Sequence, residues 1–406
     1  MHILLIHQAF AAITEPGGTR HHEMARYLVE KGHRVTVITG QTSYLTGRET
    51  VDQKGTVVEV DDVGVEIIRT YSSTWLHQSF FRRVISFFSF MLSSFFIGFR
   101  VGKVDLVWGT SPPLFQGMTA WLLARLKGAP FLFEVRDLWP YFAVEVGVLQ
   151  NPVIIRLSEF LEAFLYRRAD RIVVNSPGYI GHVSERGGRK VDLIPNGVDT
   201  SMFDPDADGG EYREIFQADD KYVVLYAGAH GISNDLGVVI EAAGKLRSEE
   251  GVIFVLVGDG KEKPNLIELA KSMDIDNVLF QSPVPKQDIS QVLAAADLCI
   301  AILKPIEAFR VTYPNKVFDY MAAGRPVLLA IDGVIREVVE EAEAGVFVPP
   351  GDSSELAERV ILLSEDREKG ICMGQSGRRY VEKHFDRRDH VDEMVKIFED
   401  TIRRMD

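Results

Sequence analysis

Continuous apolar runs alternate with amphipathic segments along most of the chain. The first half contains the runs HILLIH, RVTVIT, VDLVWGT, PFLFEV, RIVVNS and VDLIP, which are typical of strands buried on both faces of a parallel sheet. Between the first two runs, residues 21–31 carry apolar side chains at helical spacing, and Gly32 follows as a left-handed cap. The first forty residues therefore predict a β-α-β unit.

The same alternation restarts after a turn-rich acidic stretch at residues 195–210. The strands that we expect there are YVVLYAG, VIFVLVG, NVLFQ, LCIAIL, PVLLA and GVFVP, with helical stretches such as 237–246 and 353–364 between them. Two successive runs of this kind predict an α/β protein of two doubly wound, Rossmann-like domains. Ligands of such domains bind at the carboxyl ends of the strands, so we expect the site in a cleft between the domains.

The domain boundaries follow from the same pattern. We expect an N-terminal domain at residues 1–198 and a C-terminal domain at residues 199–383. The charged segment 384–406 is helical in pattern, and we expect it to pack back against the N-terminal domain.

Composition excludes several classes of protein. The net charge of −13 argues against a nucleic-acid partner. Cys299 and Cys372 lie far apart and have no His or Cys at ligand spacing, which argues against a zinc site or a disulfide scaffold and favours a reducing compartment. The first residues read as a strand and not as a signal peptide.

One segment departs from the acidic average. Residues 70–130 carry six Lys/Arg and a single acid, and the uncharged run from Val84 to Phe99 is 16 residues long. As a helix it measures about 24 Å, shorter than the roughly 30 Å of a bilayer core. A core helix and an in-plane membrane dock both remain open. We favour a dock at residues 80–103 that meets an anionic membrane surface, and its expected contact residues are Arg82, Arg83, Phe88 and Phe95.

The stretch FRVTYPNKVFDYMAAGRPVLLA combines a loop, a helix start and a strand. Lys316 lies in the first turn of the helix, where a cation is disfavoured unless an anion binds there. A phosphate would satisfy the lysine and the free N–H groups of that turn. Asp319 lies one turn later and could accept hydrogen bonds from sugar hydroxyls. The alternative is an ordinary loop-helix-strand unit with a solvated lysine.

This stretch resembles the donor-site helix of glycosyltransferase family 4, which consists of retaining enzymes with the GT-B fold. EVRDLWP, IPNGVDTSMF, the GG pair after the first strand and YAGAHG recur in that family in the same order. The chain is most similar to bacterial enzymes that build O-antigen and capsule units with N-acetylfucosamine or N-acetylglucosamine. It departs from the family in its Glu-x7-Glu pair, where Val311 and Asp319 stand.

The resemblance implies that residues 1–198 bind the acceptor and residues 199–383 bind the nucleotide sugar, and it implies the site residues. The diphosphate of a nucleotide sugar, expected to be UDP-linked, would lie by Lys316, Arg310 and the loop from Gly228 to Asn234. Asp319 would hold the ribose, and the stretch near Val284 would hold the base. Arg136 and Asp137 are the further catalytic candidates, although they could equally belong to a structural ion-pair network. The remaining candidates are Gly18 for the donor, Gly17 and His21 for the acceptor, and Gly231 in the loop after the first strand of the second domain.

These features predict a retaining transferase that uses no metal or other cofactor, because the sequence contains no DxD triplet at a strand end. The expected acceptor is a polyprenyl-diphosphate-linked saccharide of bacterial surface polysaccharide synthesis. The expected location is the cytoplasm, peripherally on the inner face of the cell membrane. Three alternatives remain: a transferase with a soluble acceptor, a nucleotide-sugar 2-epimerase and a non-catalytic donor-binding protein.

Overall fold

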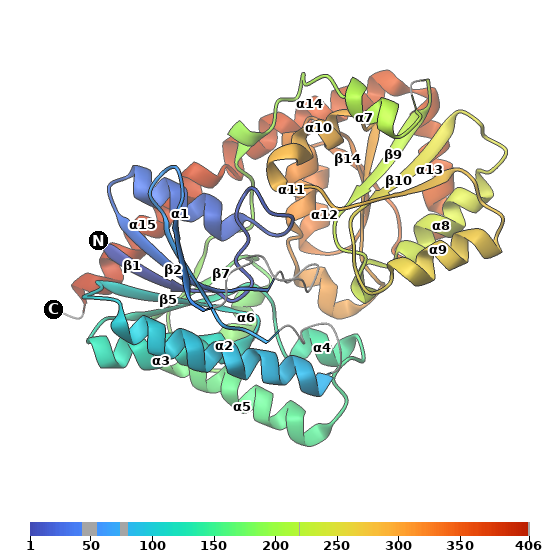
Figure 1. The fold of residues 1–406 in the computed structure, drawn as a ribbon. Helices are drawn as coiled ribbons and strands as arrows, with labels where there is room; N and C mark the ends of the chain where they lie inside the picture. The colour runs from blue at the N-terminus through green and yellow to red at the C-terminus, as the bar shows by residue number, and fades with distance from the viewer. Residues whose placement is uncertain (43–54, 74–79, 219, 405–406) are drawn as a thin grey trace. The chain divides into compact units, whose positions relative to one another are not determined.

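The computed structural model describes residues 1–42, 55–73, 80–218 and 220–404, and the chain divides into two compact units. Unit 1 consists of residues 1–12, 17–195 and 388–406, and unit 2 consists of residues 13–16 and 196–387. The divisions thus lie at Pro195/Asn196 and Arg387/Arg388, a few residues from the expected ones. Each unit is built on its own sheet (Figure 1). The prediction of two doubly wound α/β domains is confirmed.

Unit 1 contains an eight-stranded sheet in the order β3-β4-β2-β1-β5-β6-β7-β8. All neighbouring strands pair in parallel except β3 and β4, which form an antiparallel edge that the apolar pattern did not predict. The strands are β1 (His2–Ile6), β2 (Arg34–Gly40), β3 (Val57–Val60), β4 (Glu66–Thr70), β5 (Leu106–Ser111), β6 (Phe131–Val135), β7 (Arg171–Val174) and β8 (Val191–Leu193).

Helices cover both faces of this sheet. On one face α1 packs with the C-terminal helix α15. The ring centroids of Phe398 on α15 and Trp108 on β5 lie 5.6 Å apart. Arg171 on β7 pairs with Asp400 of α15 at 3.0 Å. The other face carries α2, α3 and α5 (Figure 1). The helices are α1 (Arg20–Glu30), α2 (Phe80–Arg100), α3 (Leu114–Lys127), α4 (Tyr141–Glu145), α5 (Pro152–Arg168), α6 (Tyr179–Glu185) and α15 (Arg387–Arg403).

Unit 2 contains a six-stranded, fully parallel sheet in the order β11-β10-β9-β12-β13-β14. Its strands are β9 (Tyr222–Ala227), β10 (Val252–Val257), β11 (Val278–Gln281), β12 (Leu298–Ile302), β13 (Val327–Ala330) and β14 (Gly345–Phe347). The order reverses between β9 and β12, and α/β sheets bind ligands at the carboxyl ends of strands at such a point.

The helices of unit 2 cover both faces of its sheet and leave two separate apolar cores. They are α7 (Gly210–Ile215), α8 (Leu236–Lys245), α9 (Lys263–Ser272), α10 (Ile289–Ala294), α11 (Asn315–Ala322), α12 (Val334–Glu341), α13 (Ser353–Glu365) and α14 (Arg367–His384). Short 3-10 turns include η3 (Ile232–Asn234), η4 (Lys286–Asp288) and η5 (Glu307–Val311). Each of these three turns carries or adjoins a predicted site residue.

The long apolar helix α2 is half core and half surface. Phe90, Ser86, Ser94 and Gly98 are buried on one side. A Cβ on Gly98 would lie 2.4 Å from the side chain of Leu123, so the glycine lets α2 approach α3 closely. The opposite side of α2 is exposed. The two readings that the sequence left open, core helix and exposed apolar surface, therefore describe the two sides of one helix.

By length and composition alone, residues Arg82–Arg100 are apolar enough to cross a membrane. Phenylalanines lie on both sides of the helix, since Phe90 is buried and Phe88 is exposed. The exposed apolar side chains form a single stripe of Phe88, Leu92, Phe96 and Phe99. Phe95 is only partly exposed and packs edge-on against Phe96, with 5.7 Å between the ring centroids.

Candidate active site

Lys316 in unit 2 occupies the first turn of α11, where the sequence predicted it. Its Nζ donates to the hydroxyl of Tyr226 at 2.6 Å and to Oδ1 of Asn234 at 3.2 Å, and it lies 4.0 Å from the centre of the Tyr226 ring. In the part of the chain that the structure describes, no carboxylate forms an ion pair with this ammonium group. Burial lowers the pKa of Lys316 to about 7. Lys316 is therefore a partly desolvated amine whose charged form a bound anion would stabilise.

The loop after β9 lies directly beside this lysine. Gly228 has a φ of +154°, and a Cβ there would approach both Nζ of Lys316 and the hydroxyl of Tyr226 to 3.2 Å. The absence of a side chain leaves the ammonium group and the backbone accessible to a ligand. A Cβ on Gly231 would lie 3.5 Å from Nδ2 of Asn234. The structure thus brings together Gly228, Gly231, Asn234 and Lys316.

Asp319 follows Lys316 by one turn of α11 and forms an ion pair with Lys286 of η4 at 2.6 Å. Lys286 also lies 5.1 Å from the centre of the Phe203 ring. Val284, the residue expected near the base, precedes this lysine by two positions and packs against the core of unit 2. Lys286 was missed because no local pattern links it to a residue 33 positions away.

Arg310 lies in a different environment from the one we expected. Its guanidinium pairs with Glu307 at 3.3 Å and with Asp332 at 3.2 Å. It contributes to a pocket after β12 and β13 whose lining includes Lys304, Phe309 and Pro350. Val311 ends the same 3-10 turn. Two carboxylates already partner Arg310, so its assignment to the diphosphate stays a prediction.

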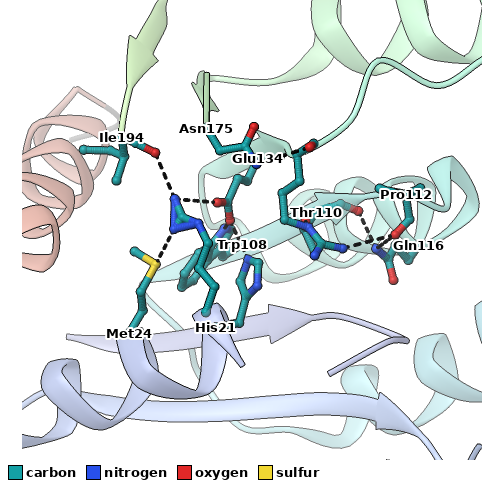
Figure 2. Close-up of polar contacts among 11 residues, drawn as sticks. His21, Met24, Trp108, Thr110, Pro112, Gln116, Glu134, Asn175 and Ile194 are labelled. Atoms are coloured by element: carbon teal, nitrogen blue, oxygen red, sulfur yellow. Dashed lines mark hydrogen bonds and ion pairs between the residues drawn. The ribbon is translucent and has the colours of Figure 1, made fainter. Parts of the chain in front are cut away.

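Unit 1 holds a second polar cluster, centred on Glu134 of β6 (Figure 2). This carboxylate accepts hydrogen bonds from Nε2 of His21 at 2.7 Å and from Nε1 of Trp108 at 3.0 Å. It also pairs with Arg20 at 3.1 Å, and all four side chains are buried. Burial raises the pKa of Glu134, but the charges of His21 and Arg20 and the His21 hydrogen bond outweigh it and leave the pKa below its usual range.

His21 is neutral at pH 7, because burial lowers its pKa more than Glu134 raises it. The hydrogen bond to Glu134 therefore places the ring proton on Nε2. Its Nδ1 is buried and has no hydrogen-bond partner within the described part of the chain, and the ring centroid lies 4.5 Å from that of His7. The sequence predicted His21 but missed its partners Arg20, Trp108 and Glu134. A glutamate inside the apolar run PFLFEV is the signal that could have identified the cluster.

Arg136 and Asp137 follow the end of β6, as the sequence predicted. Nε of Arg136 donates to the hydroxyl of Thr110 at 2.7 Å, and Nη2 donates to the carbonyl of Pro112 at 3.4 Å (Figure 2). Nδ2 of Asn175 donates to the Arg136 carbonyl at 3.2 Å. Burial raises the pKa of Asp137 to about 6, although the charge of Arg136 opposes the shift. These contacts hold the guanidinium at the carboxyl end of the sheet.

Gly17 and Gly18 lie in the loop that enters α1. Gly17 has a φ of +146°, which favours glycine, and a Cβ there would contact Ala11 at 3.2 Å. A Cβ on Gly18 would meet nothing within 4 Å, so open space lies beside it. Among the described residues, no group of three or more His, Cys, Asp or Glu is placed to hold a metal ion.

Comparison with known proteins assigns both halves of the chain to families. Residues 17–197 match the glycosyl transferase 4-like domain, and residues 221–366 match the glycosyl transferases group 1 domain. Together the two matches cover most of the chain. The chain is also 26% identical over 312 residues to a colanic acid biosynthesis glycosyl transferase of Escherichia coli K12, WcaI, across 74% of this chain and 76% of WcaI.

Solved structures agree with this assignment at the level of the fold. Sucrose-phosphate synthase of Thermosynechococcus elongatus superposes with a TM-score of 0.79 at 18% identity, over 98% of both chains. Anabaena HepE in complex with UDP and glucose superposes with a TM-score of 0.74 at 17% identity, over 98% of this chain and 99% of HepE.

Proposed function

We propose that this chain, whose two halves match glycosyl transferase domains and which has the GT-B fold, transfers a sugar from a nucleotide diphosphate sugar to a lipid-linked acceptor. The proposed sugar is an N-acetylhexosamine or a deoxy-N-acetylhexosamine, and the acceptor is a polyprenyl-diphosphate-linked saccharide. The name of WcaI, a glycosyl transferase of colanic acid biosynthesis, supports a role in surface polysaccharide synthesis. The single observation that carries the donor assignment is the half-buried Lys316 beside Gly228.

The donor diphosphate would neutralise Lys316 and accept hydrogen bonds from the N–H groups in the first turn of α11. Complexes of HepE with UDP and glucose support a UDP-linked donor. Asp319 would bind ribose hydroxyls while Lys286 holds its carboxylate in place. Positive charge beside the leaving diphosphate stabilises the transition state, because negative charge develops on the diphosphate there.

The acceptor would use the carboxyl end of the unit 1 sheet, near Arg136, Asp137 and His21. In the proposed step, an acceptor hydroxyl attacks the anomeric carbon on the face from which the diphosphate leaves. The bond between the anomeric carbon and the phosphate oxygen breaks, and the hydroxyl proton passes to that oxygen. The configuration at the anomeric carbon is retained. The enzyme would act on the cytoplasmic face of the membrane, where nucleotide sugars are available.

Incubation with candidate UDP-sugars and a synthetic polyprenyl-diphosphate-linked sugar tests this proposal. We expect product that contains one added sugar in the retained configuration, together with free UDP, detected by mass spectrometry and NMR. Interconversion of the UDP-sugar without acceptor would instead indicate a 2-epimerase. Equal turnover with a soluble acceptor would contradict the lipid-linked assignment, and donor binding without any turnover would contradict catalysis.

A further inference from the structure

The helical face of unit 1 exposes apolar side chains on three adjacent helices. On α2 they form the stripe of Phe88, Leu92, Phe96 and Phe99 already described. On α3, Leu122 and Leu126 are exposed one turn apart. On α5, the exposed side chains are Val153, Leu157 and Phe160, which are 63%, 64% and 68% exposed. Spacings of three and four residues place each set on one side of its helix.

These three stripes belong to one surface, because α3 contacts both α2 and α5, and the three helices lie side by side in Figure 1. Phe88 on α2 stacks against Phe115 on α3, with 4.7 Å between the ring centroids. Trp121 on α3 meets Phe164 on α5 edge-on at 4.9 Å. We call the exposed apolar side chains of α2, α3 and α5 the three-helix face. Contiguous apolar surfaces of this extent mark interaction sites.

The charge of these helices identifies the kind of partner. Together α2, α3 and α5 contain eight Lys/Arg and two Glu, in a chain whose net charge is −13. One of the two, Glu162, is buried and pairs with His182 and Arg186. The exposed cations Arg100, Arg125 and Arg156 accompany the apolar stripes. An apolar surface among cations suits anionic phospholipid, which offers hydrocarbon and negative headgroups together.

We propose that the three-helix face, and not α2 alone, docks unit 1 on an anionic phospholipid bilayer. A second copy of the chain fits less well, because a symmetric dimer would oppose this cationic face with itself. The inference deepens the proposed function, because the lipid-linked acceptor lies in such a bilayer. It does not depend on donor chemistry and can be tested without sugar transfer.

Vesicle cosedimentation of the full chain tests the proposal. We expect the wild type to pellet with vesicles that contain phosphatidylglycerol and to stay in solution with vesicles of phosphatidylcholine alone. The double variant Leu157→Asp/Phe160→Asp on α5 should lose about tenfold or more in vesicle affinity, as should Phe96→Asp on α2. Arg156→Gln should lose about fivefold at low salt and less at high salt.

The matched control is Ile371→Asp on α14 of unit 2, which replaces an equally exposed apolar residue and should bind vesicles like the wild type. Each variant should keep the wild-type thermal shift on addition of UDP, which shows that the chain is folded and separates this test from that of the donor site. The proposal would be overturned if the α5 double variant bound vesicles as tightly as the wild type does. It would also be overturned if phosphatidylglycerol did not increase the vesicle affinity of the wild type. Sedimentation velocity gives the oligomeric state. If the wild type is a dimer and the α5 double variant is a monomer, the three-helix face is instead an interface between two copies of the chain.

Discussion

At the scale of single residues, the main feature is a half-buried lysine, Lys316, which forms an ion pair with no carboxylate among the described residues. Lys316 has its pKa lowered to about 7 from the usual 10.5. A bound diphosphate would favour the charged form and raise this pKa again. Donor binding and proton uptake are therefore coupled at this one side chain.

We expect UDP affinity to fall as pH rises above 7, by about tenfold per pH unit until the UDP-bound pKa is reached. Calorimetry at pH 8 in two buffers of different ionisation enthalpy should reveal close to one proton taken up per UDP bound. In Lys316→Met the uptake should vanish, and UDP should bind at least about tenfold more weakly. Uptake that persists in this variant would assign the proton to another group.

The lowered pKa of Lys316 also makes the free energy of unfolding depend on pH. Between pH 7 and pH 10.5 the unfolded chain binds the Lys316 proton while the folded chain has released it. The contribution of Lys316 to the free energy of unfolding therefore rises as pH rises from 7 to 10.5. Below pH 7 the folded chain carries the charged amine, and its desolvation destabilises the fold by the full amount. Chemical denaturation of Lys316→Met should lack this rise between pH 7 and pH 9, whereas Lys396→Met, at an exposed position, should keep it.

Glu134 illustrates a different kind of buried charge. Glu134→Gln would remove the carboxylate charge that pairs with Arg20 in the core of unit 1, and we expect a loss of about 3–5 kcal/mol in the free energy of unfolding. The exposed Glu159→Gln should change it by less than about 0.5 kcal/mol. Adding Arg20→Met to Glu134→Gln should recover part of the loss. A double variant as unstable as the sum of the two single ones would show that Arg20 and Glu134 do not act as a pair.

At the scale of elements, α15 is the helix whose packing is most informative. Phe398 is fully buried against Trp108, in the core that α1 also shares. Phe398→Ala should lower the free energy of unfolding by about 3–5 kcal/mol, because it removes a large buried ring and leaves a cavity. Urea denaturation followed by tryptophan fluorescence measures this directly. Lys396→Ala on the exposed side of the same helix is the control and should be close to neutral.

The sequence predicted the central strands well because both faces of a parallel sheet are buried and their apolar runs are continuous. The antiparallel edge of β3 was missed because Val57–Val60 alternates between partial burial and exposure over only four residues. The predicted site residues after β9 and on α11 come together because strand-end loops and helix starts share one edge of the sheet. The contacts of Lys286 and Tyr226 could not be predicted, because they depend on side-chain packing between elements far apart in sequence. Glu134 could have been singled out as a glutamate inside an apolar run, but its pairing with His21 could not.

At the scale of the whole molecule, the proposed donor site and the proposed membrane-docking surface lie in different units. Unit 2 carries Lys316 and the loop from Gly228 to Asn234, and unit 1 carries the Glu134 cluster and the three-helix face. Since we propose that Lys316 and the start of α11 stabilise the leaving diphosphate, EDTA should leave turnover unchanged within about twofold. A loss of activity on chelation that Mg²⁺ restores would contradict metal-independent transfer.

The path of the chain through α15 also constrains how the protein folds during synthesis. Residues 17–195 leave the ribosome first, yet one apolar face of their sheet, around Trp108, is covered only when α15 arrives. Residues 196–387 of unit 2 are translated in between. The unit that begins first is therefore finished last, and its uncovered face has to be kept from aggregating while unit 2 is being made.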